Sequence, residues 1–216
     1  MKGDKLLFQN HHRLKAQRLV DKIIYFYSHI EDKLVVTLGG ESGTGKTEIA
    51  YNLREMLYKK GLRAQLISLD DYYKVKWSIR NKVREETNAK NVGINEIDWE
   101  LLDATVEAFK NNKEENLFRQ LNKYIDDYEY TYFNDDSVDI LIIEGLYALD
   151  INKSDLRIYL EGGYKETRSF RLERGKEKQG ELRNKILEKE CIDIRKTLKN
   201  AYLLVTFDGK ICQNEN

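Results

Sequence analysis

The sequence contains no proline and only two cysteines, and no apolar run in it is long enough to span a bilayer. Proline makes up about 5% of an average chain, so turns here must depend on glycine, asparagine and aspartate. Cys191 and Cys212 provide neither a disulfide framework nor the paired spacing of a zinc site. We therefore expect free thiols in a reducing compartment.

An excess of charge of either sign is also missing. Lys and Arg number 37, as do Asp and Glu, which gives a formal net charge of zero and nothing typical of a nucleic-acid or membrane surface. The first five residues lead into no continuous apolar segment, which argues against a signal peptide. We expect one soluble, cytoplasmic domain over residues 1–216 that binds neither nucleic acid nor membrane.

What the sequence does contain is a phosphate-binding loop. Residues 34–38 form a short apolar run typical of a buried strand, and a helical pattern begins at Lys46. The residues from Gly40 onward match G-x-x-x-x-G-K-[ST] without a mismatch: Gly40, Glu41, Ser42, Gly43, Thr44, Gly45, Lys46 and Thr47. Glycines let the backbone approach a phosphate closely, and the N–H groups at the helix start attract it. We expect Lys46 to reach the β- and γ-phosphates and Thr47 to hold Mg²⁺.

An acidic and aromatic cluster follows the next predicted strand, residues 63–69. Its sequence is Asp70-Asp71-Tyr72-Tyr73-Lys74. Ligands of open α/β sheets bind beyond the carboxyl ends of the strands, so these carboxylates should lie beside the phosphate-binding loop. One of them could accept a proton from an attacking hydroxyl or hold a Mg²⁺-bound water. An ordinary acidic turn with aromatic cover explains the same residues equally well.

A nearly continuous apolar strand is predicted at residues 138–145, as for a strand covered on both faces. Glu144 at its end occupies the position where an acidic residue orients Mg²⁺ or its water shell. Further strands are predicted at 155–160 and 201–205, with a short tail after them.

Arg168, Arg171 and Arg174 recur at every third residue and so share one face of a predicted helix. Three guanidinium groups on one face repel each other unless they meet anions. Phosphate contact by a closing lid is favoured for at least one of them, and pairing with neighbouring glutamates is the alternative.

The other helices are predicted from apolar periodicity at 11–32, 46–60, 98–110, 114–123 and 181–199. Asp98 is the expected N-cap of its helix. His11 and His12 are interpreted as part of a solvated helix start. Residues 75–97 have weak periodicity and many charges, which indicates either a mobile segment over the site or a solvated one.

A dense aromatic cluster lies between residues 124 and 133. Tyrosines can stack on a base or a sugar ring, with Tyr124 the candidate for acceptor binding, or they can close one end of a core. The second interpretation is favoured for most of them, which are Tyr124, Tyr128, Tyr130, Tyr132 and Phe133.

Together these residues resemble the uridine kinase/phosphoribulokinase branch of P-loop kinases. The features that carry the resemblance are, in the family's order, Gly40–Thr47, the Asp70-Asp71-Tyr72-Tyr73 motif, the strand ending at Glu144-Gly145, and the arginine-rich segment from Arg168. Asp98 is placed like an acidic residue that contacts the acceptor's sugar hydroxyls. The resemblance covers roughly residues 34–205, so the helical extension at 1–33 lies outside it.

The resemblance implies a P-loop NTPase fold, a three-layer α/β/α sandwich with a mostly parallel five-stranded sheet and a small helical lid at about 164–185. It also implies transfer of the γ-phosphoryl group of ATP to a hydroxyl of a small molecule. Asp70 resembles the family's general base, Thr47, Glu144 and Asp70 resemble the Mg²⁺ partners, and Tyr73 resembles a wall of the acceptor pocket.

One departure from the family leaves the acceptor open. Uridine kinases usually carry a histidine and an arginine that help to read the base, and the segment 124–131 contains neither. A uridine or cytidine kinase-like enzyme is the leading prediction. A kinase for pantothenate, glycerate or a sugar phosphate is the alternative, and a nucleotide-binding regulatory module ranks lower. The N-terminal helix could cover the core or pair with a second subunit.

Overall fold

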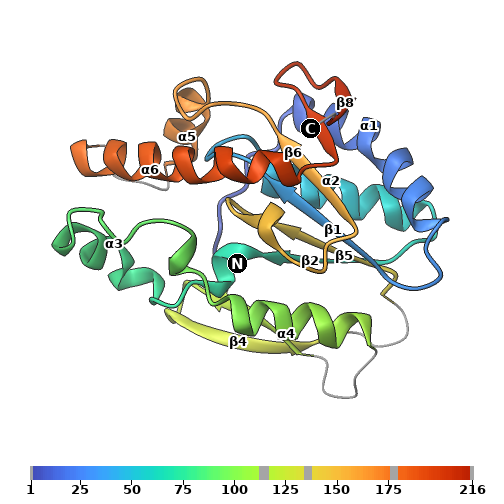
Figure 1. Cartoon of the computed structure of the whole chain (residues 1–216), viewed down its shortest axis with the longest axis horizontal. Helices are drawn as coiled ribbons and strands as arrows, with labels where there is room; N and C mark the ends of the chain where they lie inside the picture. Colours follow the sequence, from blue (N-terminus) through green and yellow to red (C-terminus); the bar gives the residue numbers. More distant parts are fainter. Residues whose placement is uncertain (1, 112–116, 134–137, 176–179, 215–216) are drawn as a thin grey trace.

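The computed structural model describes residues 2–111, 117–133, 138–175 and 180–214, and its elements form three layers around a central sheet (Figure 1). In chain order they are α1 (Asn10–Tyr27), β1 (Leu34–Gly39), α2 (Lys46–Lys59), β2 (Ala64–Ser68), η1 (Leu69–Tyr72), α3 (Trp77–Glu86), η2 (Ile94–Glu96), α4 (Trp99–Lys110), β3 (Leu117–Asn122), β4 (Asp127–Tyr132), β5 (Ile140–Glu144), η4 (Ala148–Asp150), β6 (Leu156–Leu160), α5 (Arg168–Arg174), α6 (Glu181–Thr197), η5 (Leu198–Asn200), β7 (Leu203–Val205) and β8 (Ile211–Gln213).

The central sheet has six strands in the order β2-β5-β1-β6-β7-β8. The first five are parallel, and β8 pairs antiparallel with β7. The mostly parallel α/β sandwich is therefore confirmed, with one short strand that the sequence did not predict. Strands β3 and β4 form a separate antiparallel hairpin, and within the described residues no helix is long and apolar enough to cross a membrane.

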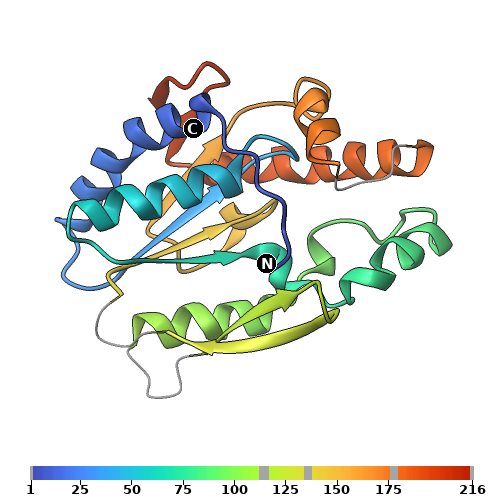
Figure 2. The same ribbon diagram turned by 180° about the vertical axis from the view of Figure 1, so that it is seen from behind.

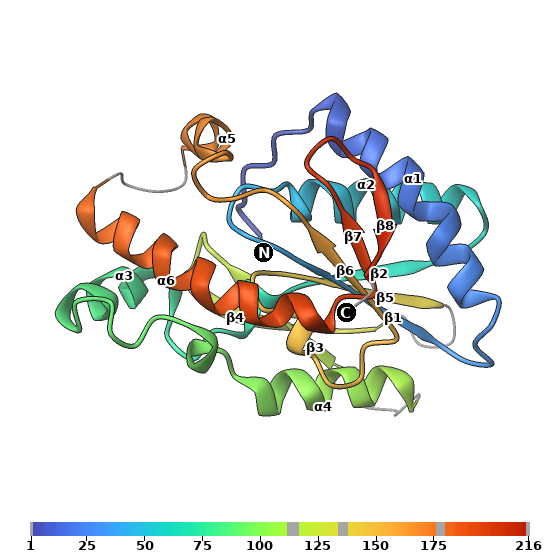
Figure 3. The same cartoon turned by 45° about the horizontal axis from the view of Figure 1, so that its top comes forward.

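Each face of the sheet is covered by its own hydrophobic core, because side chains along a strand point alternately to the two faces. Leu34, Val36 and Leu38 of β1 pack on one face in the same core as residues of α1 and α2. Figures 2 and 3 show these two helices side by side over the sheet. Val35 packs on the other face with residues of α4, β3 and α6. The N-terminal helix thus covers the core, which was one of its two predicted roles.

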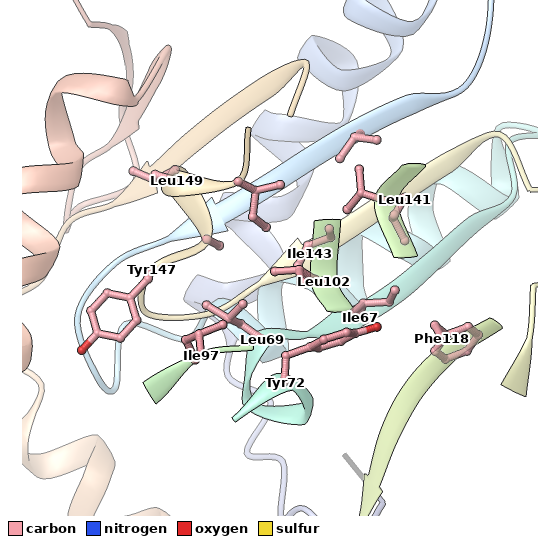
Figure 4. Packing of buried hydrophobic residues seen from close by; sticks show 14 of the residues in the cluster. Ile67, Leu69, Tyr72, Ile97, Leu102, Phe118, Leu141, Ile143, Tyr147 and Leu149 are labelled. Carbon is pink, nitrogen blue, oxygen red and sulfur yellow. The ribbon is translucent and has the colours of Figure 1, made fainter. Parts of the chain in front are cut away.

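The second core reaches the carboxyl ends of the strands, where it supports the candidate site. Figure 4 shows Leu69 and Tyr72 packed beneath Ile143 of β5, with Tyr147 at the side of the cluster. All four side chains are at most 1% exposed. The turn after β2 is therefore held on a rigid base rather than on a solvated loop.

Several predicted elements need correction. Residues 117–122 are strand β3 rather than the end of a helix at 114–123, and residues 114–116 lie outside the described residues. The charged segment 75–97 contains the helix α3, and the first helix ends at Tyr27 rather than at residue 32. Of the aromatic cluster only Phe133 joins the core, whereas Tyr124, Tyr130 and Tyr132 are exposed.

Candidate functional site

The predicted phosphate-binding loop joins β1 to α2 and depends on its glycines. Gly40 has φ of 147°, and a Cβ there would lie 2.5 Å from the carbonyl oxygen of Leu160. Gly45 has φ of 82°, and a Cβ there would lie 2.4 Å from the ring of His12. Only glycine combines a positive φ with the absence of a Cβ atom, so these two residues let the loop present its backbone N–H groups at the start of α2.

Lys46 lies at the first position of α2, and its side chain folds back over the loop. Its Nζ donates to the carbonyl oxygens of Gly40 (2.9 Å) and Glu41 (2.8 Å). Burial lowers the pKa of Lys46, while the nearby carboxylates of Glu144 and Asp70 act in the opposite direction. The ammonium group is therefore hydrogen-bonded to the loop and feels the charges of two acidic residues.

Glu144 ends β5 in the middle of the sheet. The register places it beside Leu38 of β1 and Ser68 of β2, which lie at the carboxyl ends of those strands, next to the two turns of the site. Burial raises the pKa of the Glu144 carboxyl, and the charge of Asp70 raises it further, against Lys46 and a hydrogen bond from Ser68. A nearby cation would favour the ionised form of this carboxyl.

A cavity of about 90 Å³ adjoins this point, and its lining includes Thr47, Ser68, Asp71, Gln120 and Glu144. Thr47 and Glu144, the two predicted Mg²⁺ ligands of this region, thus line a common cavity. Among the described residues, no group of three or more His, Cys, Asp or Glu side chains is arranged to hold a metal ion.

The two aspartates of η1 have different surroundings. Asp71 is 2% exposed and accepts a hydrogen bond from the backbone N–H of Leu121 (2.9 Å) in the hairpin. Burial raises the pKa of Asp71 to about 7. Asp70 is half-buried on the side of Lys46 and Glu144, whose pKa values it influences. Asp71 attaches the hairpin and also lines the cavity beside Thr47 and Glu144, so the role of Asp70 as general base stays a prediction.

Tyr73 and Asp98 are brought together by backbone pairing. Tyr73 forms an isolated antiparallel bridge with Ile97, and Asp98 N–H donates to the carbonyl oxygen of Tyr72 (2.8 Å). The Asp98 side chain caps α4 by accepting from Leu101 N–H (3.3 Å), so the predicted cap is confirmed. Asp98 therefore has a structural role as the N-cap of α4, which is independent of the predicted contact with an acceptor.

Arg119 of β3, which the sequence analysis did not identify, connects the turn after β2 with Asp98. It is 7% exposed, and its Nε donates to the carbonyl oxygen of Asp71 (2.7 Å). Its Nη1 lies 3.9 Å from Asp98 Oδ2. Recognising this arginine would have required assigning β3 as a strand.

The lid helix α5 packs directly on the phosphate-binding loop. Thr167 Oγ1 donates to the carbonyl oxygen of Ser42 (2.6 Å), and the Tyr164 N–H donates to Glu41 Oε2 (2.7 Å). Arg171 is buried and donates to Thr167 Oγ1 (2.9 Å), Arg174 pairs with Glu48, and Arg168 is exposed. The three arginines thus have three different environments, and residues 176–179 of the predicted lid lie outside the described residues.

Two predicted features lie elsewhere than expected. Tyr124 is 83% exposed at the turn of the hairpin, so the structure does not bring it together with Asp70 and Tyr73. His12 is buried rather than solvated and rests against Gly45. Its contact joins segments far apart in the sequence, and no local pattern indicates it.

These features define a P-loop kinase: a phosphate-binding loop, acidic residues beyond the ends of the two neighbouring strands, and an arginine-bearing helix on the loop. Residues 35–207 match the model of the phosphoribulokinase/uridine kinase family, and the chain belongs to that family.

Curated relatives with different acceptors match this chain. It is 25% identical over 213 residues, 91% of its length, to a bifunctional alpha-galactosidase/sucrose kinase of Mediterraneibacter gnavus. It is 31% identical over 137 residues, 60% of its length, to uridine-cytidine kinase C of Dictyostelium discoideum. The matches span 23% and 27% of those longer proteins. The fold is also similar to phosphoribulokinase from Rhodobacter spheroides, with a TM-score of 0.61 and 13% identity over 82% of this chain and 71% of that one.

Proposed function

We propose that this chain is an ATP- and Mg²⁺-dependent phosphotransferase that uses a hydroxyl of a small molecule as acceptor. The observation that carries the proposal is the convergence of Lys46, Glu144 and Asp70 beyond the carboxyl ends of β1, β5 and β2. Mg·ATP, when bound, supplies the phosphoryl group and the cation. A regulatory module without catalysis would not need a base beside the phosphate-binding loop.

Each residue of the site has a role in this proposal. Lys46 would leave the loop carbonyls and neutralise the transferring phosphoryl group, while Thr47 and Glu144 would hold the cation and its water shell. Asp70 accepts the proton of the attacking hydroxyl or orients that hydroxyl. Arg171 and Arg174 of the lid add positive charge from the other side of the loop.

Two acceptor classes have support. A pyrimidine nucleoside, the leading prediction from the sequence, is supported by the similarity to uridine-cytidine kinase C. A non-nucleoside acceptor is supported by the relative with sucrose kinase activity, which matches more of the chain. The exposure of Tyr124 also supports a non-nucleoside acceptor, because Tyr124 was the candidate of the aromatic cluster for acceptor binding and does not lie at the site.

The test is ADP release from Mg·ATP in the presence of uridine, cytidine, sucrose, pantothenate, D-glycerate or a sugar phosphate. Acceptor-dependent release that disappears in a Lys46→Ala variant and persists in Lys59→Ala, an exposed lysine on the same helix, would support the proposal. Slow ADP release that no acceptor changes would favour the regulatory module instead.

A further inference from the structure

Arg80 of α3 is buried with part of its guanidinium group unpaired. The residue is 9% exposed, and Nε and Nη2 are buried with no hydrogen-bond partner in the described part of the chain. Its Cζ lies 3.6 Å from the centre of the Tyr73 ring, so the ring covers one side of the group. From the sequence, this segment was expected to be either mobile over the site or solvated.

Arg84, one turn further along α3, shows what the same edge of a guanidinium group binds. Its Nε and Nη2 donate to the two carboxylate oxygens of Glu96, at 2.8 Å each, and Glu190 lies 3.6 Å from its Nη1. Residues four apart lie on one face of a helix. The two arginines therefore lie on the same face of α3. The Nε and Nη2 edge of Arg84 binds a carboxylate, whereas the same edge of Arg80 binds no group in the described part of the chain.

A buried guanidinium edge without an acceptor destabilises the folded protein, because water that solvates it in the unfolded chain is removed. The contact with the Tyr73 ring offsets only part of that cost. Buried polar groups without a hydrogen-bond partner are expected at functional sites, where a loss of stability is tolerated because the group binds a ligand. The Nε and Nη2 pair is also the edge that binds carboxylate or phosphate in a bidentate manner.

The position of Arg80 relates it to the acceptor rather than to ATP. Tyr73, on which it lies, directly follows the turn that carries Asp70, and its backbone pairs with Ile97 beside Asp98. Lys46 and Arg171 contact the phosphate-binding loop instead. An anion held by Arg80 would thus be part of the molecule whose hydroxyl faces Asp70.

We propose that Arg80 binds an anionic group of the acceptor, a carboxylate or a phosphate, so that the substrate class is a hydroxy acid or a sugar phosphate. This inference rests on the proposed phosphotransfer, with Asp70 and Tyr73 at the acceptor end of the site. The hydroxyl and carbonyl oxygens of neutral sugars and nucleosides can accept hydrogen bonds from this guanidinium edge, but they leave its positive charge uncompensated.

The experiment measures acceptor binding by calorimetry and turnover by ADP release. The probes are D-glycerate, pantothenate, fructose 6-phosphate, sucrose and uridine, so that carboxylate, phosphate and neutral acceptors are separated. The variants are Arg80→Met and Arg80→Lys, and the control is Lys82→Met, which removes an exposed positive charge from the same helix.

We expect the wild type to bind an anionic acceptor. Arg80→Met should weaken that binding by about 30-fold or more, since truncating one partner of a buried charge pair has a large effect. Arg80→Lys should recover only part of it, because an ammonium group lacks the bidentate edge. Acceptor binding by Lys82→Met should stay within about twofold of the wild type. The KM for ATP should stay within about twofold in all variants.

Thermal unfolding distinguishes binding from a structural role. Arg80→Met should leave Tm unchanged or raise it, since the variant removes a buried unpaired group. A clear fall in Tm would instead indicate a role in packing against Tyr73 and overturn the inference.

Acceptor results can also overturn it. Full activity of Arg80→Met on a neutral acceptor, or no binding of any anionic probe to the wild type, would overturn the inference and leave the proposed phosphotransfer standing. Anion binding that depends on Arg80 but never leads to turnover would support the anion site and count against the proposed function.

Discussion

Arg174 of the lid helix lies 3.6 Å from the carboxylate of Glu48, one residue after Thr47, and the Glu48 side chain is 1% exposed. The contact joins the lid to the first turn of the phosphate-binding helix. A carboxylate so close to the phosphate position keeps Arg174 within reach of an incoming nucleotide. In the proposed function, ATP binding would exchange the Glu48 carboxylate for a phosphate as the partner of Arg174.

The first prediction concerns this exchange. Arg174→Gln should lower kcat/KM for ATP by about 10²-fold, because one charged donor to the phosphates is lost. Lys165→Gln, an exposed lysine just before the lid helix, is the matched control and should change kcat/KM by less than about twofold. Equal kinetics in the two variants would show that Arg174 only pairs with Glu48.

The two neighbouring aspartates can be separated by conservative substitution. Asp70→Asn should lower kcat by about 10² to 10⁴-fold while the KM for ATP stays nearly constant, since a general base is removed and the phosphate-binding loop is untouched. Asp71→Asn keeps an oxygen for the Leu121 N–H and should retain most of kcat. If the large loss occurs in Asp71→Asn instead, the assignment of the base is reversed.

Asp98 allows its capping role to be distinguished from acceptor binding. Asp98→Ala should destabilise the protein by about 1 kcal/mol through loss of the N-cap, whereas Asp98→Ser keeps a capping oxygen and should recover most of that loss. An acceptor KM that remains raised in Asp98→Ser would demonstrate substrate contact. A KM that recovers together with stability would limit Asp98 to capping, and chemical denaturation with steady-state kinetics measures both.

The stability of the protein should fall in mild acid because of His12. Burial, then the neighbouring His11, lowers the pKa of His12 from 6.5 to about 4 in the folded state. Between these values the unfolded chain binds a proton that the folded chain does not, so the free energy of unfolding decreases as pH falls from about 6.5 to 4, by at most about 1.4 kcal/mol per pH unit. His12→Gln should show a shallower decrease, whereas His29→Gln, at an exposed site, should follow the wild type. Parallel curves for His12→Gln and wild type would refute this account.

Elements with strong local signals were predictable from sequence. β1 and β5 are continuous apolar runs, and the glycine pattern from Gly40 to Thr47 identifies its loop without reference to distant residues. The end of β5 at Glu144 follows from the same reasoning. The part of the site assigned to the acceptor was harder to predict from the sequence. Strand β3 contains residues such as Arg119 and Gln120 that suit a helix, and only its pairing with β4 fixes it as a strand.

Helix α3 was missed for a different reason. The side chains that it buries are Arg80 and Arg84, and a search for apolar periodicity does not register a buried face made of guanidinium groups. The contacts of His12 with Gly45 and of Arg174 with Glu48 join residues more than 30 positions apart. Such pairs become visible only when the chain is folded.

The pairing of Tyr73 with Ile97 has a consequence for how this site can change. The Lys74 N–H donates to the carbonyl oxygen of Glu96 (2.9 Å), so the chain leaves and re-enters the acceptor region at almost the same point. Everything between, including α3, is an excursion with its two ends tied together. We therefore expect that residues 75–95 can be exchanged between related kinases with the strands and Asp70 left in place, and that such an exchange would transfer acceptor preference.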